Sequence, residues 1–184
     1  LKPIMDIQAT LSDFKARLDP KIAAYFDKTL REAEKEDDFV YQALEHVKTM
    51  TLAGGKRLRP SFMYYGYLAA GGTDRERILN TAIAVELIHM FLLVHDDIID
   101  HAVLRRLKPT VNIQFGGEVA VLLGDFLYAR AFEMFALPTP TDSAKPSVGI
   151  SAETLGKPFR FRQRFIRSSM RASSMTGSLL SHTS

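Results

Sequence analysis

The stretch that decides the fold is residues 78–100, ILNTAIAVELIHMFLLVHDDIID. It is nearly all apolar until its acidic end, so we predict a long helix at the centre of the fold. This helix is expected to run from about residue 74 to residue 104. Thr73 is predicted to cap its start, with Glu76 completing a capping box.

On both sides of this helix, apolar residues recur every three or four positions, which is typical of further amphipathic helices. We expect these helices over residues 4–18, 22–30, 39–52, 58–70 and 118–136. The first is predicted to end where Pro20 follows Asp19, and the helix over 58–70 is expected to be buried on most sides. No segment has the strict alternation of a half-buried strand. We therefore predict an all-α fold, an antiparallel helical bundle with short loops.

The overall composition is that of a globular protein, with 184 residues, 46% of them hydrophobic and 24% charged. The absence of cysteine excludes a disulfide framework, a thiolate zinc site and a cysteine nucleophile. No uninterrupted apolar run reaches the roughly 18 residues that span a bilayer. We expect a soluble, cytoplasmic protein without a transmembrane segment.

The charge is distributed unevenly along the chain. Residues 1–137 carry 17 Lys+Arg against 19 Asp+Glu, whereas residues 138–184 carry 7 against 2 and include 19 Ser, Thr or Pro. We therefore separate a helical region, 1–137, from a basic tail, 138–184, that is expected to be poorly ordered. Three interpretations of the tail stay open: the product of a truncated or frameshifted gene, a basic extension that contacts nucleic acid or anionic lipid, or a short amphipathic helix.

Three carboxylates interrupt the apolar sequence near the end of the central helix. Asp96 and Asp100 are one helical turn apart on one face, His89 lies on that face two turns earlier, and Asp97 is about 100° away. Two carboxylates at this spacing suit a Mg²⁺ ion that also binds phosphate oxygens. The alternative is a solvated helix end. His95 is assigned no catalytic role.

Two basic clusters complement these acids. Lys56, Arg57 and Arg59 directly follow Gly54-Gly55, so a glycine turn brings cationic side chains and backbone N–H groups together near a helix start. Arg105-Arg106 follows the acids by five and six residues. These features indicate a phosphate or diphosphate site; the alternatives are a solvated basic triplet and cations that favour a helix C-terminus.

In combination, these motifs resemble those of the trans-type isoprenyl diphosphate synthases, the polyprenyl synthetase family. GGKRLRP at 54–60 is similar to a family element, and DDIID at 96–100 is similar to its first aspartate-rich motif. Arg105-Arg106 matches the family's paired arginines, and LLGD at 122–125 resembles the start of its next core helix. The resemblance covers about residues 40–136 and is strongest to geranylgeranyl and farnesyl diphosphate synthases.

The resemblance implies an isoprenoid synthase fold and a Mg²⁺-dependent prenyl transfer. An allylic diphosphate ionises, and the double bond of isopentenyl diphosphate attacks the carbocation before a proton is lost. The implied metal ligands are Asp96 and Asp100, with Asp97 in support. The implied contacts to diphosphate are Arg105 for the allylic substrate and Lys56, Arg59, His89 and Arg106 for isopentenyl diphosphate, with Arg57 nearby. Phe91, followed by Leu92, is expected to limit the product to about C15–C20.

The sequence also departs from the family. A second aspartate-rich motif, a Lys-Thr pair and a Gly-Gln element are not found, so the C-terminal half of the fold is expected to be missing. Leu107 stands where a glycine usually follows the paired arginines. The second interpretation is therefore a non-catalytic remnant or partner subunit that binds diphosphate or a full-length synthase. Pairing as a homodimer or with a related synthase is expected. A di-metal carboxylate bundle built on Glu86 and His89 is the weakest alternative.

Overall fold

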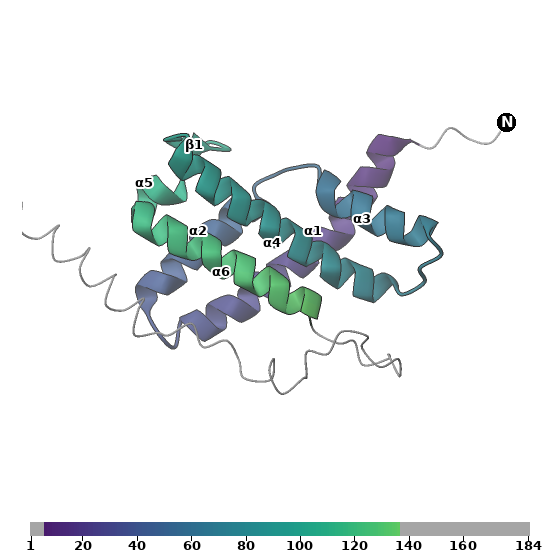
Figure 1. The fold of residues 1–184 in the computed structure, drawn as a ribbon, viewed down its shortest axis with the longest axis horizontal. Coiled ribbons are helices and arrows are strands. Elements are labelled where there is room, and N and C mark those ends of the chain that lie inside the picture. The colour runs from purple at the N-terminus through teal and green to yellow at the C-terminus, as the bar shows by residue number, and fades with distance from the viewer. Residues whose placement is uncertain (1–5, 137–184) are drawn as a thin grey trace, which may run out of the picture. The chain divides into compact units, whose positions relative to one another are not determined.

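The computed structural model of this protein describes residues 6–136, and the predicted tail 138–184 lies outside the described residues. The elements are α1 Ile7–Ala33, α2 Asp38–Leu52, α3 Leu58–Ala69, α4 Arg75–Ile99, β1 Leu104–Arg105, β2 Lys108–Pro109, α5 Val111–Phe115 and α6 Gly117–Ala136 (Figure 1). The prediction of an all-α bundle is confirmed, apart from one hairpin of two strands with two residues each.

Helix α4 is the centre of the fold, as its apolar sequence predicts. It packs against α6 along most of its length and also contacts α1, α3 and α5. Its inward side chains, among them Leu87, Met90 and Val94, are fully buried. Within the described residues α4 is the one helix long and apolar enough to cross a membrane, and half of its most apolar stretch is buried in the structure. The core helix of a globular protein has these same properties.

The prediction that the first helix ends at Pro20 is wrong, because α1 continues through this proline to Ala33. Pro20 lies on the exposed side of the helix, where water can solvate the carbonyl that loses its partner. On the opposite side Phe14, Leu18 and Ile22 form one uninterrupted buried stripe. Burial of this stripe outweighs the local cost of the proline.

Both ends of α4 differ from the prediction. Asp74, not Thr73, caps the helix, because its carboxylate accepts a 2.9 Å hydrogen bond from the Arg77 backbone N–H. The helix stops at Ile99 instead of continuing to Leu104. The chain then forms the antiparallel hairpin of β1 and β2, in which Arg105 pairs with Lys108.

The turn of this hairpin is made by Arg106 and Leu107, which have φ values of 51° and 65°. A two-residue hairpin turn of this kind requires positive φ at both central positions, and glycine adopts that conformation most easily. Leu107 is nevertheless accommodated, because the residue is 95% exposed. The leucine therefore strains the backbone without preventing the turn.

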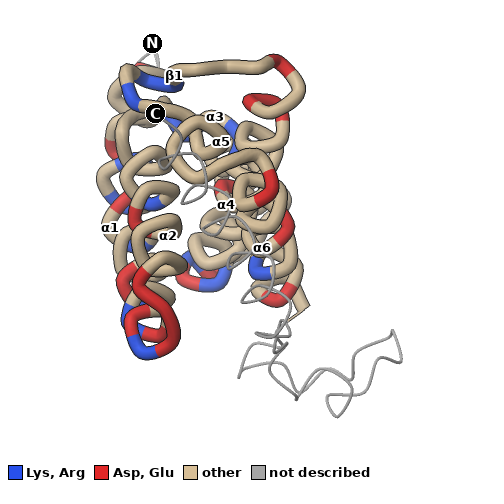
Figure 2. The backbone as a smooth tube through the Cα atoms, turned by 90° about the vertical axis from the view of Figure 1, so that its left-hand side faces the viewer, with Lys and Arg blue, Asp and Glu red and all other residues tan. Residues whose placement is uncertain are grey.

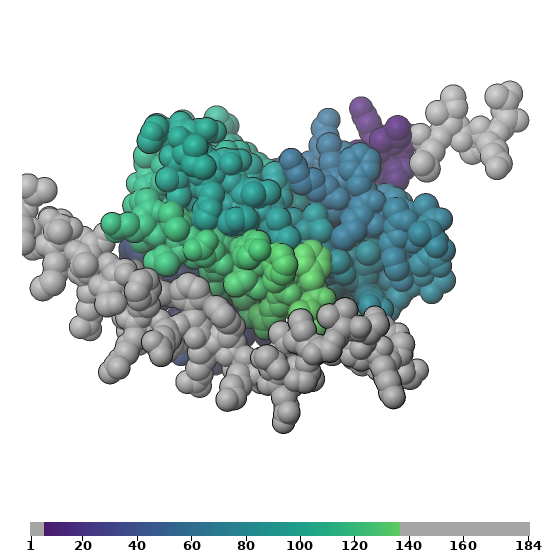
Figure 3. Space-filling view, viewed as in Figure 1, coloured from purple at the N-terminus to yellow at the C-terminus, as the bar shows by residue number. Residues whose placement is uncertain are grey.

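Helix α3 is less buried than predicted. Its buried residues are Pro60, Ser61 and Tyr64, whereas Phe62 is 75% exposed. The short helix α5 was not predicted, because five residues are too few for a helical pattern to appear. The predicted helix over 118–136 is confirmed as α6, which lies at the surface in Figure 3.

Candidate diphosphate site

A glycine turn joins α2 to α3 and opens the candidate site. Gly54 and Gly55 have φ values of 140° and 95°, which glycine reaches without strain. A Cβ atom on Gly55 would lie 3.2 Å from Nη2 of Arg106. The second glycine therefore leaves room for a guanidinium group to approach the backbone of the turn.

A cavity of about 130 Å³ lies beside this turn. Its walls come from the turn, the start of α3, the middle of α4 and the hairpin: Gly55, Lys56, Arg57, Leu58, Arg59, Glu86, His89 and Arg106. The structure thus brings together four of the residues predicted to contact a diphosphate, Lys56, Arg59, His89 and Arg106. Basic groups far apart in sequence converge here, in a cavity suited to a small anion.

His89 faces the cationic side chains of this cavity. Nη1 of Arg59 lies 3.4 Å from Nε2 of His89, where the imidazole nitrogen can accept a hydrogen bond. Burial lowers the pKa of His89, and the positive charges of Arg59 and the paired arginines lower it further. Both effects favour the neutral imidazole in the absence of a bound anion.

The two consecutive arginines of the hairpin point to different parts of the site. Arg106 donates from Nη1 to the carbonyl oxygens of Met50 and Gly54, at 3.0 and 3.2 Å, and so fixes the glycine turn. Burial and the charge of Arg57 lower the pKa of Arg106. Arg105 instead binds Asp97. The alternative interpretation, in which this pair lies at the C-terminus of the long helix, does not hold, because both residues belong to the hairpin, whose basic residues are blue beside β1 in Figure 2.

Asp97 is buried, with 1% of its surface exposed, and its carboxylate is bound by Arg105 in a two-pronged contact. Nε of Arg105 donates to both carboxylate oxygens, at 3.0 and 2.9 Å, and Nη2 donates to Oδ1 at 2.6 Å. The hydrogen bonds to Asp97 raise the pKa of Arg105. This ion pair anchors the hairpin to the end of α4.

Asp96 and Asp100 behave differently from Asp97, because both carboxylates are exposed at the end of α4. Within residues 6–136 no three His, Asp or Glu side chains converge into a complete metal site. Two exposed carboxylates one turn apart nevertheless fit a Mg²⁺ ion, which takes one or two protein carboxylates and completes its shell with water and substrate phosphate. Asp96 and Asp100 are the residues that would hold it.

Arg57 is brought to the site but faces away from solvent. Its side chain is 0% exposed. Its guanidinium donates to three helices: Nε to Asp19 of α1 at 2.7 Å, Nη1 to Glu86 of α4 at 2.5 Å, and Nη2 to the carbonyl oxygen of Thr51 of α2 at 2.8 Å. Every nitrogen of this guanidinium thus has a partner within the protein.

The residues predicted to limit product length lie on two different sides of α4. Phe91 packs against the ring of Tyr128 on α6, with 5.1 Å between ring centroids, and against His95 at 4.7 Å. Leu92 is 46% exposed and lies one turn before Asp96 on the same face of the helix. Phe91 therefore borders α6, and Leu92 borders the open face that carries the acids.

Sequence reasoning missed the structural part played by His95 and Gly124. Nε2 of His95 lies 3.2 Å from the carbonyl oxygen of Val121 on α6. A Cβ atom on Gly124 would lie 2.2 Å from that same nitrogen. The glycine in the LLGD motif was the available signal, because a glycine inside a helix often marks a close packing contact.

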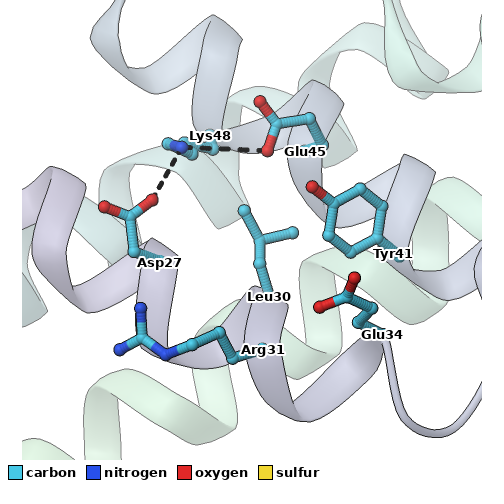
Figure 4. A pocket seen from close by; sticks show the side chains of 7 residues that line it. All are labelled: Asp27, Leu30, Arg31, Glu34, Tyr41, Glu45 and Lys48. Atoms are coloured by element: carbon cyan, nitrogen blue, oxygen red, sulfur yellow. Dashed lines mark hydrogen bonds and ion pairs between the residues drawn. The ribbon is translucent and has the colours of Figure 1, made fainter.

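A second cavity, of about 240 Å³, lies between α1 and α2 (Figure 4). Lys48 bridges its walls, with Nζ 2.8 Å from a carboxylate oxygen of Asp27 and 3.8 Å from one of Glu45. The hydrogen bond to Asp27 raises the pKa of Lys48. Charges of both signs are mixed here, so this cavity lacks the cationic character of the cavity at the glycine turn.

Comparison with known proteins identifies the family that this chain resembles. A family model described as Polyprenyl synthetase matches residues 40–154. The short chain isoprenyl diphosphate synthase of Methanocaldococcus jannaschii is 44% identical over 115 residues, which are 62% of this chain and 34% of that protein. The geranylgeranyl diphosphate synthase of Saccharolobus solfataricus is 53% identical over 81 residues, which are 44% of this chain and 24% of that protein.

Solved structures give the same result for the fold. An FPP/GFPP synthase from Zymomonas mobilis matches with a TM-score of 0.57 at 33% identity, over 71% of this chain and 46% of that one. The geranylgeranyl pyrophosphate synthase of Corynebacterium glutamicum, complexed with isoprenyl diphosphate and magnesium, has a TM-score of 0.53 at 30% identity, over 64% and 40%.

This chain thus spans about a third or less of the length of these two curated relatives. The family model nevertheless covers more than half of the chain. The resemblance found in the motifs is therefore confirmed, and with it the isoprenoid synthase fold over part of its length. The chain belongs to the polyprenyl synthetase family.

Proposed function

We propose that this chain carries the diphosphate-binding part of a Mg²⁺-dependent prenyltransferase that condenses isopentenyl diphosphate with an allylic diphosphate. The observation that supports this most is the cationic cavity at the glycine turn, which lies beside a hairpin that also reaches the acids of α4. Arg106 lines the cavity, and its neighbour Arg105 binds Asp97. The hairpin thus connects the cationic cavity to the acidic end of α4.

The residues have distinct parts in this proposal. Lys56, Arg59, His89 and Arg106 bind isopentenyl diphosphate, while Arg105, already oriented by Asp97, binds the allylic diphosphate with its remaining donors. Asp96 and Asp100 hold Mg²⁺, which when bound neutralises the departing diphosphate. No protein nucleophile is required: the allylic C–O bond breaks to give a carbocation and free diphosphate, the double bond of isopentenyl diphosphate attacks the carbocation, and the cation so formed loses a proton.

The direct test is an assay of the purified chain with Mg²⁺, an allylic diphosphate and labelled isopentenyl diphosphate. Formation of a C15–C20 product that disappears in Asp96→Ala supports the enzyme. Asp38→Ala is the matched control, because Asp38 is an aspartate on α2 away from the cavity. Binding of substrate without turnover in the wild-type chain would contradict the enzymatic proposal.

Product length in the same assay tests Phe91. Its ring fills space between α4 and α6, so we expect Phe91→Ala to lengthen the product by opening that space. Phe62→Ala, on the exposed side of α3, is the control that removes the same ring far from this seam. An unchanged product length in Phe91→Ala would remove Phe91 as the limiting residue.

The second candidate is a non-catalytic subunit that binds diphosphate or pairs with a full-length synthase. The observation that favours it is an apolar stripe left exposed on α6, formed by Val121, Tyr128, Phe132 and Phe135. The spacings of seven, four and three residues place these side chains on one face of the helix. Pyrophosphate binding without turnover, together with association with a related synthase, would select this candidate.

A further inference from the structure

The burial of Arg57 is not explained by the proposed function. It lies between two residues expected to bind diphosphate, Lys56 and Arg59, yet its own side chain is fully buried. Its three nitrogens are bonded to Asp19, Glu86 and the Thr51 carbonyl. Three of the five N–H donors of this guanidinium are thereby engaged within the protein, and its side chain is not exposed to solvent.

Glu86 is also not explained by the proposed function, because it places a carboxylate in the wall of a cationic cavity. Its side chain is 4% exposed, and the residue lines the cavity beside Lys56, Arg59 and His89. A carboxylate in the wall of an anion site repels the anion that the cationic residues attract. The 2.5 Å hydrogen bond from Nη1 of Arg57 explains why Glu86 is present. Removing either residue would leave the other as a buried, unpaired charge.

Arg57 and Glu86 lie close in the chain to residues that line the cavity, so their contact can affect the geometry of the cavity. Arg57 has the left-handed backbone conformation that starts α3, with φ 52° and ψ 37°, and Arg59 follows two residues later. Glu86 is three residues before His89 on α4, which places it on the adjacent turn. The contact between Arg57 and Glu86 therefore sets the start of α3 against the part of α4 that carries His89.

We propose that Asp19, Arg57 and Glu86 form a positioning network that holds the diphosphate-binding side chains of the cavity in place. This inference rests on the proposed function, because the positioned side chains are the ones proposed to bind diphosphate. Asp19 ties it to α1, and the Thr51 carbonyl ties it to the end of α2. Three helices are thereby joined to the loop that presents Lys56 and Arg59, and the part played by the network is to position these side chains.

Pyrophosphate binding by calorimetry tests this with two variants. Arg57→Lys keeps the charge, but a single ammonium group cannot reach three separate partners, so we expect affinity to fall about tenfold. Glu86→Ala removes a negative charge from the cavity wall, so charge alone predicts tighter binding, whereas loss of positioning predicts weaker binding. Tighter binding in Glu86→Ala, or unchanged affinity in Arg57→Lys, would overturn the proposal.

Circular dichroism and urea unfolding establish that each variant is folded under the assay conditions. Lys21→Ala is the matched control for loss of an ion pair between helices, because Lys21 of α1 bonds Glu76 of α4 on the exposed surface. We expect this control to bind pyrophosphate as the wild type does. A loss of affinity equal to that in Arg57→Lys would show a general effect of stability instead of positioning.

A ligand-free measurement separates this proposal from the proposed function. If the network holds Arg59 beside His89, Arg57→Lys should let Arg59 move away, and the pKa of His89 measured by NMR should rise toward its ordinary value. His89→Gln identifies the resonance. A wild type that binds no pyrophosphate contradicts the proposed function, while an unchanged His89 titration in Arg57→Lys contradicts the network whether or not pyrophosphate binds.

Discussion

Among single residues, the three aspartates of α4 show how one motif contains two kinds of carboxylate. Asp97 is buried and bound by Arg105, while Asp96 is exposed. We expect Asp97→Ala to lower the free energy of unfolding by about 3 kcal/mol, because it leaves Arg105 without its partner in a partly buried position. Asp96→Ala should change it by less than about 0.5 kcal/mol.

Urea unfolding followed by circular dichroism compares the two variants directly. For enzymatic activity we expect Asp96→Ala, the variant with the smaller effect on stability, to abolish turnover while leaving the fold intact. Equal losses of stability in both variants would contradict this division of labour between a structural and a metal-binding aspartate.

If His89 contacts the diphosphate as proposed, we expect binding to depend on pH. Its pKa is lowered in the free protein by burial and by neighbouring cations, and a bound anion would raise it by favouring the imidazolium form. Binding therefore takes up a proton, and pyrophosphate affinity should rise as pH falls through the pKa of the bound state. Calorimetry from pH 8 to pH 6 measures this trend.

The control for this effect is His89→Gln, which removes the ionisable group and should leave only the pH dependence of pyrophosphate itself. Folding stability depends on pH in the opposite direction to pyrophosphate affinity. Because the folded pKa lies below the unfolded value of about 6.5, the unfolded chain binds more protons, and His89 destabilises the fold as pH falls through that value. A wild-type trend identical to that of His89→Gln would contradict proton uptake by His89.

At the scale of secondary-structure elements, the close packing of α4 on α6 depends on Gly124. A Cβ atom there would overlap the His95 ring at 2.2 Å, so we expect Gly124→Ala to destabilise the protein by about 1–3 kcal/mol. Urea unfolding measures the loss. The double variant His95→Ala/Gly124→Ala should recover part of it, because the smaller side chain makes room for the added methyl group.

The control for this prediction is Gly66→Ala on α3, where a Cβ atom would meet nothing within 4 Å. Alanine favours a helix interior over glycine by up to about 1 kcal/mol, so Gly66→Ala should be neutral or stabilising. If Gly124→Ala were equally harmless, His95 would not be seated against α6 as described.

Helix ends were the elements that sequence reasoning placed least well. Local rules predicted a stop at Pro20, a cap at Thr73 and a helix end near Leu104, and the structure differs at all three. Pro20 is overridden by the buried stripe of α1, and Asp74 provides the cap one residue later. After α4 ends, Arg105 binds back to Asp97 of the same helix and Arg106 donates to the carbonyl oxygen of Met50 on α2, and local rules for helix ends do not include such contacts.

For the molecule as a whole, the exposed stripe on α6 is the surface through which we expect the chain to associate. Phe132 is 50% exposed and stacks on Tyr128, with 4.6 Å between ring centroids. Large apolar side chains in one exposed row are typical of an interface. We expect the purified chain to form a homodimer through this stripe, and Phe132→Glu to shift it to a monomer in light scattering.

Phe62→Glu is the matched control, because Phe62 is more exposed than Phe132 but lies on α3. The same charge placed there should leave the dimer intact. A wild-type chain that stays monomeric at high micromolar concentration would contradict self-association through α6, and dissociation by Phe62→Glu would place the interface elsewhere.

The sequence by itself determined the helical class, the central position of α4 and the residue types of the site. Apolar periodicity and the spacing of glycines, acids and arginines are local properties, and they can be recognised without knowing the fold. The convergence of Lys56, Arg59, His89 and Arg106 on one cavity was likewise expected, because the motifs resemble those of a known family.

Only the tertiary structure decided which charged residues face the cavity and which support it. Arg57 resembles Arg59 in sequence, yet it is buried among Asp19, Glu86 and the end of α2, whereas Arg59 is exposed. Asp97 and Asp96 are adjacent, yet one binds Arg105 and the other faces solvent. The physical reason is that burial and ion pairing depend on how the helices and the hairpin pack against one another, and no local pattern encodes that packing.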